Sequence, residues 1–131
     1  MQQRNQDLTG VWNGLYSYPD GRSVTFVATL IESGRMLTGS THEPCVGRNG
    51  PARTLFASLM GRRDGSAVSF RKTYEAAGPR FGTVNYEGRL NGDATEIEGR
   101  WTIPGAGSGK FMMIRPLREA LKEEQKESEK I

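Results

Sequence analysis

Apolar and polar residues alternate along most of this chain, and that alternation is its dominant pattern. A two-residue period is typical of strands that bury one face and expose the other. Turn-forming residues separate the alternating segments, as in Pro19-Asp20-Gly21 and Asn91-Gly92-Asp93. The pattern predicts eight strands, near Leu8–Tyr18, Val24–Glu32, Met36–Glu43, Thr54–Arg62, Ala67–Glu75, Arg80–Leu90, Thr95–Ile103 and Gly109–Arg115.

The short connections predict that each strand pairs with the next one along the chain. Eight such strands close well into a barrel, which removes the exposed sheet edges. After Pro116 the composition changes to Glu, Lys, Leu and Ala, which are good helix formers. We therefore predict an all-β fold, an eight-stranded antiparallel up-and-down (meander) barrel with a C-terminal helix. The expected organisation is a disordered tail over 1–7, a single barrel domain over 8–115 and a helical tail over 116–131.

Composition narrows the classes of partner. Hydrophobic residues make up only 35% of the 131 residues and there are 17 glycines, which suits a barrel with a partly polar or hollow interior. The net charge of +3 is spread without a basic stripe, so we expect no nucleic-acid partner. A single cysteine, a polar N-terminus and no long apolar run lead us to expect a cytoplasmic protein without a membrane partner.

The strand period also separates inward from outward side chains. The apolar face of Ala67–Glu75 carries Val68 and Phe70, and Lys72 shares that face. A buried lysine needs a carboxylate, water or an anionic ligand. Glu43 lies in the inward phase of its own strand and is the candidate partner, although Lys72 at a barrel mouth could instead reach water. The inward phases also carry Tyr16, Tyr74, Tyr86, Trp101, Trp12 and Arg115.

The first predicted strand begins Leu8-Thr9-Gly10-Val11-Trp12, and the last one ends in Arg115. With eight meander strands between them, these residues resemble the calycin superfamily of avidins, lipocalins and fatty-acid-binding proteins, and the N-terminal strand is most similar to avidin. The resemblance implies that Trp12 and Arg115 pack together as a structural plug at one barrel end, and that the barrel holds a ligand. The biotin-site residues are not matched, since position 14 is Gly where avidins carry Asn, and only two tryptophans are present.

Other chemistry finds little support in the sequence. His42 is the only histidine, so a two-histidine metal motif is excluded and we expect no metal. The run from Gly105 to Lys110 lacks the full phosphate-loop pattern and leads into a strand, so we interpret it as a hairpin turn and expect no cofactor.

Three functions remain open at this point. The first is non-enzymatic binding of a small organic ligand, amphipathic or anionic, inside the barrel. The second is a filled barrel that acts as a structural or protein-interaction module, and the third is an enzyme that uses Lys72 as a base. Outward apolar residues also raise the hypothesis of a homo-oligomer. The predicted ligand-binding residues are Tyr16, Glu43, Lys72, Tyr74, Tyr86 and Trp101.

Overall fold

The fold is described by a computed structural model that covers residues 7–45, 53–75 and 82–117. It contains eight strands whose inward positions are mostly buried and whose outward positions are mostly exposed. The strands are β1 (Gly10–Ser17), β2 (Ser23–Ser33), β3 (Met36–Cys45), β4 (Arg53–Asp64), β5 (Ala67–Tyr74), β6 (Thr83–Leu90), β7 (Glu96–Ile103) and β8 (Gly107–Ile114).

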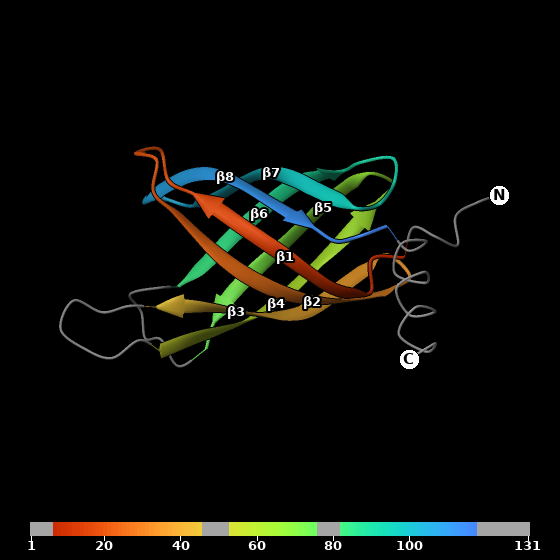
Figure 1. The fold of residues 1–131 in the computed structure, drawn as a ribbon, viewed down its shortest axis with the longest axis horizontal. Helices are drawn as coiled ribbons and strands as arrows, with labels where there is room; N and C mark the ends of the chain where they lie inside the picture. The colour runs from red at the N-terminus through yellow and green to blue at the C-terminus, as the bar shows by residue number, and fades with distance from the viewer. Residues whose placement is uncertain (1–6, 46–52, 76–81, 118–131) are drawn as a thin grey trace, which may run out of the picture.

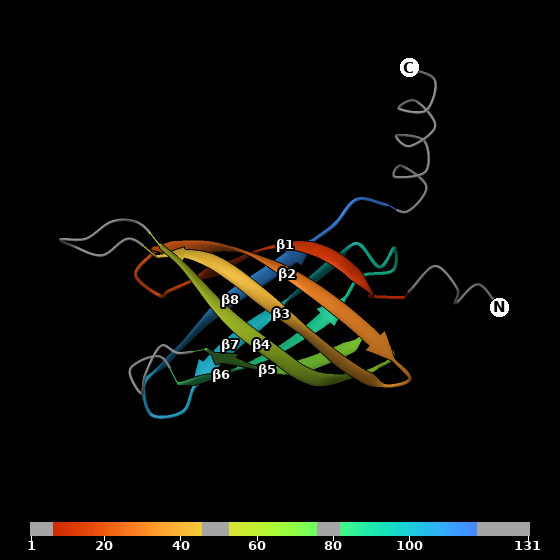
Figure 2. The same ribbon diagram turned by 90° about the horizontal axis from the view of Figure 1, so that it is seen from below.

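The strands form one closed antiparallel barrel in sequence order (Figures 1 and 2). Each strand pairs with the next, and β1 pairs with β8 from Asn13 opposite Ile114 to Ser17 opposite Lys110, which closes the cylinder. The predicted eight-stranded meander is therefore confirmed. Closure leaves no unpaired sheet edge, and it directs alternate side chains of every strand into one interior.

The predicted C-terminal helix is wrong as part of the fold. Among residues 7–45, 53–75 and 82–117 the structure contains no helix, and Arg115, Pro116 and Leu117 follow β8 without regular structure. The composition after Pro116 favours a helix only as an intrinsic propensity, which is a weak guide without a packed apolar face. The rest of that prediction, over 118–131, and the predicted disordered tail, over 1–6, lie outside the described residues.

Buried side chains lie at the end of the barrel where β1 begins and β8 ends, an end that can be located in Figure 1. The guanidinium carbon of Arg115 lies 4.4 Å from the centre of the Trp12 ring, and both Trp12 and Leu8 are fully buried. Arg115 also donates to the backbone oxygens of Ala94 at 2.9 Å and Asp7 at 2.8 Å. These contacts place Trp12 and Arg115 together at what we call the plugged end.

Arg115→Lys is expected to lower the free energy of unfolding by about 1–3 kcal/mol, because a lysine ammonium cannot reproduce two directed guanidinium bonds together with ring stacking. The measurement is urea unfolding followed by circular dichroism. Arg100→Lys is the matched control, since Arg100 is exposed on β7. Equal, small losses in the two variants would show that Arg115 does not hold this end together.

Candidate functional site

A buried polar cluster lies towards the other end of the barrel, where β1 ends and β2 begins. Lys72 on β5 donates to Oε1 of Glu43 on β3 at 2.8 Å, and the two side chains are 0% and 4% exposed. Two tyrosine hydroxyls also donate to this carboxylate, Tyr74 to Oε1 at 2.9 Å and Tyr16 to Oε2 at 2.6 Å. Three side chains from β1 and β5 thus donate to one carboxylate on β3, so the charge of Lys72 is neutralised inside the protein.

Aromatic rings surround the ammonium group of Lys72. Its Nζ lies 4.7 Å from the ring centre of Phe26, 4.9 Å from Tyr74, 5.0 Å from Tyr16 and 5.7 Å from Tyr86. Each ring face attracts a cation within about 6 Å, and the attraction is stronger where water is excluded. The cage is therefore already occupied by a cation of the protein itself.

A glycine on the neighbouring strand makes room for one wall of this cage. Phe26 lies opposite Gly14 in the β1–β2 ladder, and a Cβ at position 14 would come within 2.2 Å of the Phe26 ring. Any larger residue at position 14 would displace this ring. Gly14 therefore has a packing role.

Burial shifts the proton equilibria of the cluster. It lowers the pKa of Lys72, and the Glu43 carboxylate partly offsets this by favouring the ammonium form. Burial is also the main reason that the pKa values of Tyr16, Tyr74 and Tyr86 are raised above that of a free tyrosine. Because the tyrosines hold their protons, Tyr16 and Tyr74 serve Glu43 as hydrogen-bond donors.

A cavity of about 270 Å³ lies beside this cluster. That volume is just below the range of roughly 300–1,000 Å³ that is usual for ligand pockets. At about 30 Å³ for each water molecule it has room for roughly nine waters. The described residues of its lining are aromatic or aliphatic except for one carboxylate, and they are Tyr16, Tyr18, Glu43, Tyr74, Val84, Tyr86, Trp101 and Ile103.

The structure brings all six predicted ligand-binding residues to one end of the barrel, but it does not give them one role. Five of them line the cavity, whereas Lys72 lies behind Glu43 and is not part of the lining. Trp12 and Arg115 lie at the plugged end, apart from the cavity. Phe26 and Tyr18 were missed by the site prediction, although the strand period of Val24–Glu32 places Phe26 on the same face as Leu30.

Trp101 forms one side of the cavity, and its ring nitrogen already has a hydrogen-bond partner. Its Nε1 donates to the backbone oxygen of Ser17 at 2.9 Å, and its ring makes edge contacts with Tyr16 at 6.3 Å and Tyr18 at 5.4 Å between centroids. A Cβ at position 109 would come within 2.6 Å of this indole, so Gly109 on β8 is needed for its placement. The wall that Trp101 presents to the cavity is therefore apolar.

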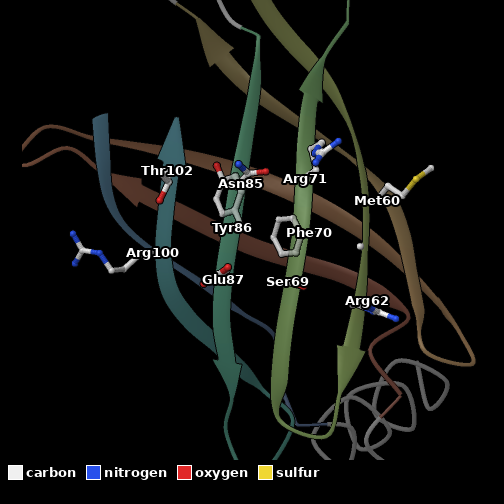
Figure 3. A pocket seen from close by; sticks show the side chains of 11 residues that line it. Met60, Arg62, Ser69, Phe70, Arg71, Asn85, Tyr86, Glu87, Arg100 and Thr102 are labelled. Carbon is white, nitrogen blue, oxygen red and sulfur yellow. The ribbon is translucent and has the colours of Figure 1, made fainter. Parts of the chain in front are cut away.

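A second, larger hollow of about 620 Å³ lies on the outside of strands β4 to β7 (Figure 3). Its charged residues include Arg62, Arg71 and Arg100, which are exposed, and Glu87, which pairs across the ladder with Arg100. The hollow has a mixed polar and apolar lining, and its charged side chains are exposed to solvent. The inner cavity, with its buried polar cluster, is the better candidate site.

The remaining predicted features lie on the outer surface. Met112 pairs across the ladder with Leu15, and both are exposed, as are Val11 and Ile114. The homo-oligomer stays a prediction.

Within residues 7–45, 53–75 and 82–117 no group of three or more His, Cys, Asp or Glu residues is arranged to hold a metal ion. The same part of the chain has no helix long and apolar enough to span a membrane.

Comparison with known proteins supports the fold. No protein-family profile and no curated protein matches the chain. Among solved structures it is similar to a redesigned β-barrel, with a TM-score of 0.59 and 18% identity over 83% of this chain and 91% of the other. It is also similar to a de novo designed fluorescence-activating β-barrel, with a TM-score of 0.62 and 13% identity over 88% of this chain and 100% of the other. At these identities the likeness establishes a closed eight-stranded β-barrel fold and leaves membership of the calycin superfamily unconfirmed.

Proposed function

We propose that this protein is a calycin-like binding protein that holds a small organic molecule in the cavity beside Glu43. The observation that carries the proposal is a cavity of about 270 Å³ walled by aromatic rings around one buried carboxylate. A concave apolar site with a few convergent polar groups is the usual form of a small-molecule site. One of the similar solved structures is described as a de novo designed fluorescence-activating β-barrel, so the fold has been given a function in design.

Two observations favour binding over the other functions. A fully filled barrel would have no room beside Glu43, whereas the cavity leaves space for a ligand. An enzyme that used Lys72 as its base would need that amine to reach the substrate, but its Nζ is bonded to Glu43 and the side chain is 0% exposed. Borohydride trapping with a carbonyl compound would test the lysine mechanism, and we expect no adduct.

The first experiment is native mass spectrometry of freshly purified protein at gentle activation. We expect a stoichiometric small-molecule adduct whose mass identifies the ligand. The matched pair of variants is Ile103→Trp, which fills the mouth of the cavity, and Thr102→Trp, which adds the same ring on the exposed outer face. The adduct should disappear in the first variant and persist in the second.

A bare protein mass, with no binding by any small aromatic compound added afterwards, would contradict the proposal. Loss of the adduct in Thr102→Trp as well would place the ligand elsewhere. The oligomer peaks in the same spectrum would test whether copies associate through the exposed face of Val11, Leu15, Met112 and Ile114.

A further inference from the structure

The net charge of the cavity wall limits what it can bind. Among the described residues of the lining, Glu43 is the only charged one, and Lys72 neutralises it from behind at 2.8 Å. An anionic ligand would face the carboxylate, and the described residues of the lining offer it no cation. A cationic ligand would compete with an ammonium that is already bonded to Glu43 and caged by rings. Since a buried charge without its own partner is costly, the site favours a neutral ligand.

A ligand that reaches Glu43 meets a hydrogen-bond acceptor, because the donors around this carboxylate already donate to it. A carboxylate offers about four lone-pair sites, and three are taken by Lys72, Tyr74 and Tyr16. The free site is on Oε2, which receives only Tyr16 in the described part of the chain. Tyr16 and Tyr74 donate their hydroxyl hydrogens to Glu43, so neither supplies a donor to a ligand at this carboxylate. This part of the wall therefore needs an N–H or O–H group.

The rest of the wall fits a flat molecule. The lining includes the rings of Tyr18, Tyr86 and Trp101, and Tyr86 is held by stacking on Phe70 at 4.9 Å and 14°. Aromatic rings favour offset or edge contacts with another ring. The volume of about 270 Å³ limits the ligand to one or two rings.

We infer that the cavity takes a neutral, planar aromatic molecule of one or two rings that donates an N–H or O–H group to Oε2 of Glu43. The inference rests on the proposed function and adds the chemical class of the ligand. It also replaces the anionic option of the sequence-based prediction by a neutral one, and it makes Lys72 a positioning residue that holds Glu43 and balances its charge.

Isothermal titration calorimetry at pH 7 with four naphthalene probes tests this class. The probes are 2-naphthol, its methyl ether, which lacks the donor, 2-naphthoate, which is anionic, and 2-naphthylmethylammonium, which is cationic. Because a hydrogen bond to a charged acceptor is stronger than one between neutral groups, we expect naphthol to bind about tenfold or more tightly than the ether. We also expect it to bind more tightly than either ion.

Variants of the cluster test whether the preference for naphthol over its methyl ether depends on Glu43. In the double variant Glu43→Gln with Lys72→Met, an amide replaces the carboxylate without leaving an unpaired charge, and the preference of naphthol over the ether should fall severalfold. Glu87→Gln, on the exposed outer face of β6, is the matched control and should leave it unchanged. If the double variant does not fold, Tyr16→Phe supplies the test. It frees a second site on Oε2, so the preference should be kept or increased.

The outcomes separate the inference from the proposed function. Equal affinities for naphthol and its ether, or tightest binding of either ion, would overturn the ligand class while the cavity remained a binding site. Loss of the preference in Tyr16→Phe would assign the contact to the tyrosine hydroxyl and overturn the role of Glu43. Binding of no probe, together with a bare mass in the native spectrum, would overturn both.

Discussion

Replacing Lys72 by methionine is expected to lower the free energy of unfolding at pH 7 by about 3–5 kcal/mol, the usual cost of removing one partner of a buried ion pair. Methionine fills a similar volume, so little of the loss comes from packing. The loss comes from Glu43, which is 3% exposed and keeps, within the described residues, only the hydroxyls of Tyr16 and Tyr74 as partners. Urea unfolding followed by circular dichroism measures it.

Two further variants show whether charge is the cause. Arg71→Met removes an exposed cation from the next position of β5, and it should change stability by less than about 0.5 kcal/mol. Adding Glu43→Gln to Lys72→Met removes the stranded charge but retains an acceptor for the tyrosines, so most of the loss should be recovered. A double variant no more stable than Lys72→Met would attribute the loss to packing and not to charge.

Stability is expected to fall steeply above about pH 10, because the structure buries the neutral forms of three tyrosines. Tyr16, Tyr74 and Tyr86 have pKa values raised above the ordinary value of 10.0, chiefly by burial. Above that value the unfolded chain releases protons that the folded protein retains, so stability decreases as the pH rises. Each buried tyrosine lowers the free energy of unfolding by up to about 1.4 kcal/mol per pH unit above that value, and the half-buried Tyr74 lowers it by less.

Lys72 changes the stability in the opposite direction to the tyrosines, and it does so over a lower range of pH. Its pKa in the folded protein is lowered from 10.5, so its contribution to stability rises with pH until the unfolded chain has also lost this proton near that value. Above about pH 10.5 the lysine no longer changes the slope, and the tyrosines alone determine it. Denaturant titrations from pH 8 to about pH 11.5 would measure both windows.

Tyr86→Phe isolates one tyrosine from the others. The Tyr86 hydroxyl has no hydrogen bond within the described part of the chain, so the variant should unfold much like the original protein at pH 7. Above pH 10 its stability should fall less steeply by up to about 1.4 kcal/mol per pH unit. If the folded protein instead showed tyrosinate absorbance for all four tyrosines near pH 10, water would be reaching the cavity and the expected slope would be absent.

The sequence alone determined the strands, the barrel and the inward faces. Alternation is a local property with a period of two, so it identified the burial of Lys72 and Tyr86 before any contact was known. Short turns gave the order of pairing, and the resemblance to calycins at Trp12 and Arg115 implied that these two residues pack together. The C-terminal helix was inferred from composition alone, without an apolar face to pack, and this part of the fold prediction is wrong.

Only the tertiary structure decided which inward residues meet. Lys72 and Glu43 are 29 residues apart, on strands separated by β4, and their contact depends on the stagger of β3, β4 and β5. Sliding a strand by two residues keeps every side chain on its face but moves it by about 7 Å along the barrel, so period and turn length leave this distance undetermined. The relative positions of the strands also bring the Phe26 ring next to Lys72. They place Glu43 in the lining of the cavity and Lys72 behind it.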